Sequence, residues 1–159
     1  MKKIITIDGP AGSGKEKISK YIAKKFRFYH LDSGVFYRRL AYEIRKNSIE
    51  INDKLKIRKL IKNFNFISLR KFAALRKEIV GSDASEIAKY DFVRDFVNKQ
   101  QRKVTKTLNN KEGFVIDGRD IGSVVFKQAF LKLYIDVDVN IRAKRRYKQL
   151  IADGEKSIY

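Results

Sequence analysis

The sequence predicts an α/β fold in which helices flank a largely parallel β-sheet. Short β-branched runs at residues 4–8, 113–117 and 131–136 have the composition of buried strands. Amphipathic helical patterns follow the first run at residues 15–26 and follow the last run up to Ala152. Because strands that alternate with helices pair in parallel, one sheet with helices packed on it is the expected architecture.

The segments between these runs are assigned from the same patterns. Residues 28–31 are predicted to form a further short strand, and 35–46 carry a helical pattern that Asp32 or Ser33 is placed to cap. A helical stripe covers 57–64, and one long helix is expected from Ser82 to Leu108. Residues 64–80 have mixed helical and extended character. On the helix at 15–26, the apolar face expected to pack comprises Ile18, Tyr21, Ile22 and Phe26.

A glycine-rich loop joins the first strand to the first helix. Its residues, Gly9-Pro10-Ala11-Gly12-Ser13-Gly14-Lys15, fit the pattern G-x-x-x-x-G-K of a phosphate-binding loop. Glycines allow the tight turn that brings successive N–H groups onto an anion, the helix directs its positive end there, and Lys15 reaches the outer phosphates. The hydroxyl residue expected after the lysine is absent, because Glu16 and Lys17 stand there. The loop predicts a nucleotide phosphate site.

Composition restricts the class of protein. A chain of 159 residues with 43% hydrophobic residues can bury one good core. It has no cysteine, no apolar run of membrane-spanning length and no secretory pattern at its N-terminus, so a cytoplasmic monomer without a membrane partner is expected. The net charge of +19 is spread along the chain, which favours solvated lysines over a nucleic-acid-binding surface.

Blocks beyond the loop resemble one known family, the bacterial cytidylate (CMP/dCMP) kinases of the nucleoside-monophosphate kinase group of P-loop NTPases. The blocks occur in family order and with family-like spacing over essentially the whole chain. They are Ile5–Lys15, Leu31-Asp32-Ser33-Gly34 with Tyr37-Arg38, Leu75-Arg76, Ser85–Arg94, Asp117–Phe126, and Leu133–Asp136 with Arg142, Arg145 and Arg146.

The resemblance implies phosphoryl transfer from ATP to CMP or dCMP, giving CDP or dCDP and ADP in pyrimidine nucleotide metabolism. Such transfer requires two anionic substrates to be aligned and neutralised. The expected catalytic residues are Lys15, Asp117 and Arg119. The expected ATP phosphate site is Gly9, Pro10, Ala11, Gly12, Ser13, Gly14, Lys15, Glu16 and Lys17. The expected CMP site is Ser33, Arg38, Ser85, Arg94, Arg119 and Asp120.

The resemblance also implies Mg²⁺, carried by the phosphates of ATP, with Asp117 acting on the ion through a water and no direct side-chain ligand assigned. It implies a single P-loop kinase domain over 1–159, with a core of about 1–34 and 82–159 and an acceptor-binding insertion of about 35–81. Family members continue past the point that matches Tyr159 with a lid and a last strand, so this chain is expected to lack both.

Several residues keep simpler interpretations. Ser33 could be only a helix cap, Arg94 a surface residue and Asp120 a solvated turn residue. His30, the sole histidine, lies in an apolar run with no identifiable partner, so a packed or capping role is expected. The arginines at 142, 145 and 146 could contact phosphates or merely cover a helix.

Three functions therefore remain open. The first is a CMP kinase, which Lys15 and the blocks after it support. The second is a relative that binds nucleotide with weak or no catalysis, which Glu16-Lys17 and the expected absence of the lid favour. The third and most distant is a basic nucleic-acid-binding protein, which the net charge suggests.

Overall fold

The computed structural model describes residues 3–64, 66, 73–108 and 112–152 of the chain. The chain divides into two compact units, which are described separately: a sheet unit of Met1–Ser33 with Arg102–Tyr159, and a helical unit of Gly34–Gln101. The predicted insertion at 35–81 falls within the helical unit. Among the residues described, no helix combines the length and the apolar character needed to cross a membrane.

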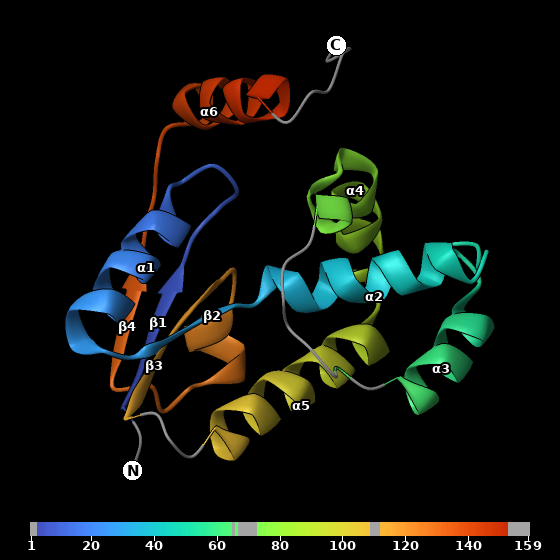
Figure 1. The fold of residues 1–159 in the computed structure, drawn as a ribbon, viewed down its shortest axis with the longest axis horizontal. Coiled ribbons are helices and arrows are strands. Elements are labelled where there is room, and N and C mark those ends of the chain that lie inside the picture. The colour runs from blue at the N-terminus through green and yellow to red at the C-terminus, as the bar shows by residue number, and fades with distance from the viewer. Residues whose placement is uncertain (1–2, 65, 67–72, 109–111, 153–159) are drawn as a thin grey trace. The chain divides into compact units, whose positions relative to one another are not determined.

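The sheet unit contains four parallel strands, which confirms the predicted α/β fold (Figure 1). In spatial order the strands are β2 (Tyr29–Asp32), β3 (Gly113–Gly118), β1 (Lys3–Asp8) and β4 (Leu131–Tyr134). The central pair runs in register from Lys3 opposite Gly113 to Asp8 opposite Gly118. Because all four strands point the same way, their carboxyl ends and the loops that leave them lie along one edge of the sheet.

Helix α1 (Lys15–Phe26) packs on one face of this sheet, where Ala23 joins Ile5, Ile7 and Val115 in a buried cluster. The predicted packing face of this helix is wrong except at Ile22. Its buried residues are Ser19 and Ala23, with Ile22 partly buried. Small side chains at the contact allow the helix to approach the sheet closely, which places the larger Ile18, Tyr21 and Phe26 at its exposed flanks.

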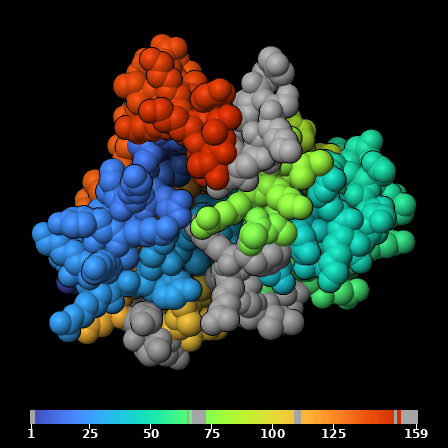
Figure 2. Space-filling model, turned by 45° about the horizontal axis from the view of Figure 1, so that its top comes forward, coloured from blue at the N-terminus to red at the C-terminus, as the bar shows by residue number. Residues whose placement is uncertain are grey.

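Helix α6 (Val139–Ala152) follows β4 and belongs to the same unit. Figure 2 shows its atoms lying against the N-terminal part of the chain, and Gly12 of the glycine-rich loop touches the backbone of Arg142. A Cβ built on Gly12 would lie 3.0 Å from the Arg142 carbonyl oxygen. The loop between β1 and α1 is therefore covered by the first turn of α6.

The helical unit consists of short helices with an apolar interior. Its helices are α2 (Gly34–Lys46), α3 (Lys54–Asn63), α4 (Glu78–Ile87) and α5 (Asp91–Thr107), with a 3₁₀ turn at Ala73–Arg76; the boundary between the units falls inside α5. The buried face of α2 includes Phe36, Leu40 and Ile44. Of the ambiguous stretch 64–80, most of the first half lies outside the described residues.

The single long helix predicted from Ser82 to Leu108 is wrong, because the structure has two helices there. The buried positions of α4 end at Ile87, and burial on α5 restarts at Val93. In a continuous helix the residue four positions after Ile87 would lie on the same buried face, but that residue is Asp91, which is exposed. The chain instead turns, and the Tyr90 carbonyl accepts hydrogen bonds from the N–H groups of Val93 and Arg94 at the start of α5.

Candidate functional site

The glycine-rich loop has the backbone of an anion cradle. Gly12 and Gly14 have φ angles of 75° and 88°, in the left-handed region that favours glycine. The Gly14 carbonyl accepts hydrogen bonds from the N–H groups of Lys17 and Ile18, so α1 begins directly at the end of the loop. The positive end of a helix of 12 residues is thereby directed into the loop.

Several charged groups around the loop influence Lys15. Its ammonium donates a hydrogen bond of 3.0 Å to the Pro10 carbonyl, so it folds back onto the loop. Burial lowers the pKa of Lys15, and the positive charge of Arg119 lowers it further. The carboxylates of Asp117, Asp32 and Asp8 act in the opposite direction on this pKa. The charges of the predicted catalytic residues Asp117 and Arg119 therefore both act on the pKa of Lys15, in opposite directions.

Asp117 is the next-to-last residue of β3, which is buried throughout, and it is paired in register with Asp32 on β2 and Ile7 on β1. Its side chain is 5% exposed, and the His30 ring nitrogen Nε2 donates to its Oδ1 at 2.5 Å. Burial raises the pKa of Asp117, while the hydrogen bond from His30 lowers it. The expectation that His30 has no partner is wrong, because its partner lies 87 residues away in sequence and only the strand pairing reveals it.

Asp8, at the end of β1, is a site residue that the sequence analysis missed. Its carboxylate oxygens accept hydrogen bonds of 2.8 Å from the N–H groups of Ile121 and Gly122. These amides open the π-helical turn Ile121–Val125 that follows Arg119 and Asp120. Asp8 thus fixes the segment that carries two predicted substrate-binding residues. The signal available in the sequence was an acidic residue ending an apolar strand directly before a glycine-rich loop.

The predicted acceptor residues of the sheet unit lie at the same edge. Ser33 is buried, and its N–H donates to the Asp117 carbonyl at 3.0 Å. A Cβ on Gly118 would lie 2.5 Å from the Ser33 hydroxyl oxygen, so the strand end and Ser33 pack tightly. Arg119 is exposed, and Asp120 is half-buried with its carbonyl accepting from the Val124 N–H.

Two arginines of α6 contact the loop itself. Nη1 of Arg145 donates to the carbonyl oxygens of Ser13 and Gly12 at 3.2 and 3.3 Å. Nη1 of Arg142 donates to the Ala11 carbonyl at 3.4 Å, while its Nε donates to the Val137 carbonyl. Arg146 instead contacts Gln149 on its own helix. From the sequence, these arginines are expected either to contact phosphates or merely to cover a helix. Neither description is complete, because two of the three donate to carbonyl oxygens of the loop.

The residues after Lys15 do not supply the usual hydroxyl. Glu16 forms an ion pair of 2.8 Å with Lys20 one turn along α1, and Lys17 is exposed. The hydroxyl oxygens of Ser13 and Ser19 are buried without a hydrogen-bond partner. Among the described residues, no group of three or more His, Cys, Asp or Glu side chains could hold a metal ion. The side-chain oxygens that could still face a metal ion near the loop are those of the carboxylates that act on Lys15, namely Asp117, Asp32 and Asp8.

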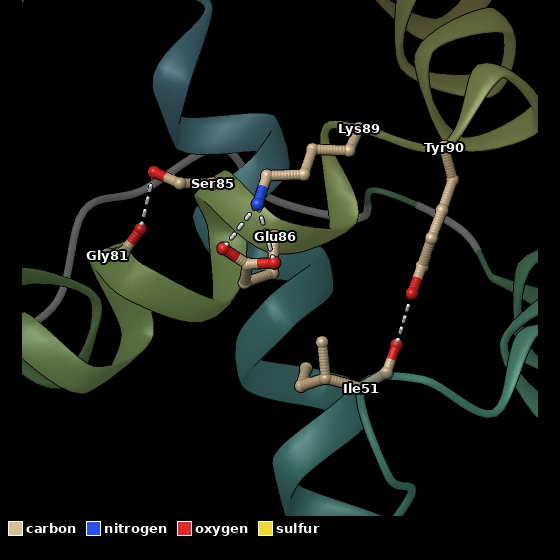
Figure 3. Close-up of polar contacts among 6 residues, drawn as sticks. All are labelled: Ile51, Gly81, Ser85, Glu86, Lys89 and Tyr90. Carbon is tan, nitrogen blue, oxygen red and sulfur yellow. Dashed lines mark hydrogen bonds and ion pairs between the residues drawn. The ribbon is translucent and has the colours of Figure 1, made fainter.

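In the helical unit, Arg38 and Ser85 both contact Gly81 of α4. Nη1 of Arg38 donates to the Leu75 carbonyl at 2.9 Å, and its guanidinium lies against Gly81. The Ser85 hydroxyl donates to the Gly81 carbonyl at 3.1 Å, as Figure 3 shows beside the Glu86–Lys89 ion pair and the Tyr90–Ile51 hydrogen bond. Arg94 is half-buried on α5.

Comparison with known proteins decides the family. The family model described as "Cytidylate kinase" matches residues 5–159. The chain belongs to the cytidylate kinase family. The cytidylate kinase of Fusobacterium nucleatum subsp. nucleatum is 37% identical over 157 residues, covering 93% of this chain and 70% of that protein. That of Rhizobium meliloti is 36% identical over 159 residues, covering all of this chain and 73% of that protein.

Other relatives of this cytidylate kinase family member agree. A bifunctional pantoate ligase/cytidylate kinase of Prochlorococcus marinus is 39% identical over 167 residues, covering 96% of this chain and 32% of that protein. The crystal structure of TT1252 from Thermus thermophilus matches with a TM-score of 0.51 and 17% identity, covering 98% of this chain and 74% of that one. This likeness concerns the fold alone. The chain is a nucleoside-monophosphate kinase, of a family whose reaction is ATP-dependent phosphoryl transfer.

The contact between Gly81 and Arg38 gives a test of the prediction that Arg38 belongs to the acceptor site. A Cβ at position 81 would lie 3.0 Å from Nη1 and from Nη2 of Arg38. The variant Gly81→Ala should displace the guanidinium and raise KM for CMP about tenfold. Its stability should be unchanged or higher, because alanine favours a helix over glycine by up to about 1 kcal/mol.

CMP-dependent steady-state kinetics and thermal denaturation check this expectation together. Ser82→Ala, at the neighbouring exposed position of α4, is the matched control and should alter neither quantity. An unchanged KM in Gly81→Ala would remove Arg38 from the acceptor site.

Proposed function

We propose that this chain transfers the γ-phosphoryl group of ATP to CMP or dCMP, giving CDP or dCDP and ADP. The observation that carries the proposal is the anion-cradling loop at the carboxyl edge of the sheet, where the charges of Asp117 and Arg119 act on Lys15. In this family such an arrangement serves phosphoryl transfer, which depends on positioning and on charge neutralisation.

The proposed roles of the residues are those that the family resemblance implies. The loop 9–15 binds the ATP phosphates through its N–H groups, and Lys15 leaves the Pro10 carbonyl to neutralise the outer phosphates. Arg119 and Arg38 hold the CMP phosphate, because a guanidinium can bind two phosphate oxygens at once. Ser85, Arg94 and Asp120 bind the cytosine edge, and Ser33 lies beside the acceptor.

The carboxylates beside Lys15 fit a magnesium ion that is carried by the nucleotide. Asp117 and Asp32 offer the oxygen chemistry that Mg²⁺ prefers, and Asp117 would hold the ion through a water. Both Asp8 oxygens already accept hydrogen bonds from amides, so fewer of their lone pairs remain for the ion. When bound, Mg²⁺ would supply charge neutralisation at the phosphates.

Position 16 allows a sharp test of metal dependence. The variant Glu16→Ser restores a hydroxyl directly after Lys15, whereas Glu16→Ala removes the same negative charge without adding one. The Mg²⁺ concentration giving half-maximal turnover should fall about tenfold in Glu16→Ser relative to Glu16→Ala. The measurement is a Mg²⁺ titration of ADP release. Equal values in the two variants would show that only the charge of Glu16 matters.

A coupled ADP-release assay with CMP, dCMP, UMP and AMP tests the function. CMP or dCMP should be converted well above the level of Lys15→Ala, and the product should be CDP or dCDP. No CMP-dependent turnover above that level would refute the kinase activity.

A second function is nucleotide binding with weak or no turnover. Glu16 and Lys17 favour it, because a carboxylate stands where phosphates bind and a metal-ligating hydroxyl is lost. Calorimetry distinguishes the two functions. Binding of ATP and CMP without formation of CDP would establish the second, and measurable CDP formation would exclude it.

A further inference from the structure

The hydrogen bonding of Asp117 is one-sided. Its Oδ1 accepts from Nε2 of His30, and among the residues described its Oδ2 makes no hydrogen bond to the protein. A carboxylate that is almost fully buried needs hydrogen bonds to stay ionised and in one orientation. The imidazole is therefore the protein group that holds this side chain in place.

His30 lies on the same face of the sheet as the groups around Lys15. Side chains alternate along a strand, and residues opposite each other in register share a face. His30 is opposite Val115, and Asp32 is opposite Asp117, so all four share one face. Val115 packs with Ala23 of α1, the helix that Lys15 begins. His30 therefore lies beside Asp117 on the sheet face that packs against α1, the helix that begins with the phosphate-binding lysine.

The hydrogen bond restricts what the ring can be. A carboxylate oxygen accepts, so the imidazole must carry its proton on Nε2. Burial alone would favour a protonated, reorientable Asp117, and the His30 contact opposes this by stabilising the ionised form. Ring and carboxylate belong to neighbouring strands, which fixes both backbones.

We propose that His30 is a positioning residue for phosphoryl transfer: it holds Asp117 by Oδ1 and leaves Oδ2 available for the water-mediated contact to magnesium that is proposed above. His30 itself contacts neither substrate. This inference rests on the proposed function, in which Asp117 acts at the phosphates. It assigns to the one histidine of the chain a role that local sequence could not show.

A double-mutant cycle between His30→Leu and Asp117→Asn tests the inference. His30→Leu removes the donor and should lower kcat about tenfold with little change in KM for CMP. Asp117→Asn should lower kcat about 100-fold. If His30 acts through Asp117, the double variant loses no more than Asp117→Asn alone. A loss of about 1,000-fold, the product of the two single effects, would overturn the inference.

Companion variants separate positioning from a structural role. His30→Gln keeps an amide donor and should restore most of the activity that His30→Leu loses. Tyr29→Phe, the preceding residue of β2, is the control and should be unaffected. Thermal denaturation of each variant shows whether it is folded. Activity in His30→Gln as low as in His30→Leu, with both folded, would contradict the proposal, as would full activity in His30→Leu.

Two further measurements keep this test independent of the proposed function. Calorimetry gives the ATP affinity of the same three variants, even if the protein does not convert CMP. The double variant should again lose no more ATP affinity than Asp117→Asn alone. ¹⁵N NMR of the His30 ring should show the proton on Nε2 in the free protein. A wild-type protein without CDP formation would refute the proposed function alone. Additive effects on ATP affinity, or a proton on Nδ1 alone, would refute the role of His30.

Discussion

Replacing Lys15 by methionine is expected to abolish phosphoryl transfer without weakening the fold. The ammonium is the cation that the loop supplies to the outer phosphates, and its loss should lower kcat on the order of 10²- to 10³-fold. Methionine keeps most of the length of the side chain and removes the ammonium group. In the free protein that charge is bound to one loop carbonyl, so few contacts are lost.

The stability of Lys15→Met follows from the pKa of Lys15. Burial and Arg119 lower this pKa below its usual value of 10.5, so the charged form is disfavoured in the folded protein. Below the lowered pKa the lysine is charged in both the folded and the unfolded state, and the full cost of burying the charge is present. The methionine variant should therefore be as stable as the wild type or more stable at pH 7.

The pH dependence of this difference has a defined sign. As pH rises through the lowered pKa of folded Lys15, the folded state releases its proton while the unfolded state still binds one. Stability then rises with pH in the wild type and not in the variant. The advantage of Lys15→Met should shrink towards pH 10.5.

Urea denaturation at several pH values, combined with the ADP-release assay, measures both effects. Lys24→Met, at an exposed position in the last turn of α1, is the control and should retain activity. Wild-type turnover in Lys15→Met would refute the role of the loop lysine.

Local sequence was sufficient for the parts of the site that are continuous in the chain. The strand at residues 4–8, the loop through Lys15 and the helix behind it are all specified by neighbouring residues, and they occur as predicted. The strand at 113–117 is also local, and its carboxylate was placed at the correct sheet edge because parallel strands share that edge.

What sequence could not show depends on the pairing of distant segments. The His30–Asp117 contact needs the register of β2 against β3, and the Asp8 contacts join residues 113 and 114 positions apart. The break between α4 and α5 could not be seen from local sequence either, because both segments have good helical patterns. The turn between them depends on which face of each helix is buried. Packing also decided the buried face of α1, where small residues rather than large ones meet the sheet.

Asp8→Asn is expected to produce the largest loss of stability among the variants considered. The two Asp8 oxygens accept from the Ile121 and Gly122 amides in a buried position. An asparagine has one oxygen, so its NH₂ group would face an N–H donor and one buried amide would lose its acceptor. Hydrogen bonds to charged groups contribute about 1.5–3 kcal/mol each, so the free energy of unfolding should fall by about 3 kcal/mol.

The loss should be measured by urea denaturation as a fall in the midpoint at an unchanged slope. Asp53→Asn is the matched control, because Asp53 accepts from the Lys56 N–H at the start of α3, where water can replace the bond. Its effect should be much smaller. The amide that loses its acceptor directly follows the segment of Arg119 and Asp120. Asp8→Asn should therefore also raise KM for CMP in the molecules that remain folded. Equal losses of stability in the two variants would show that Asp8 does not hold this segment, and that another contact keeps Arg119 at the edge of the sheet.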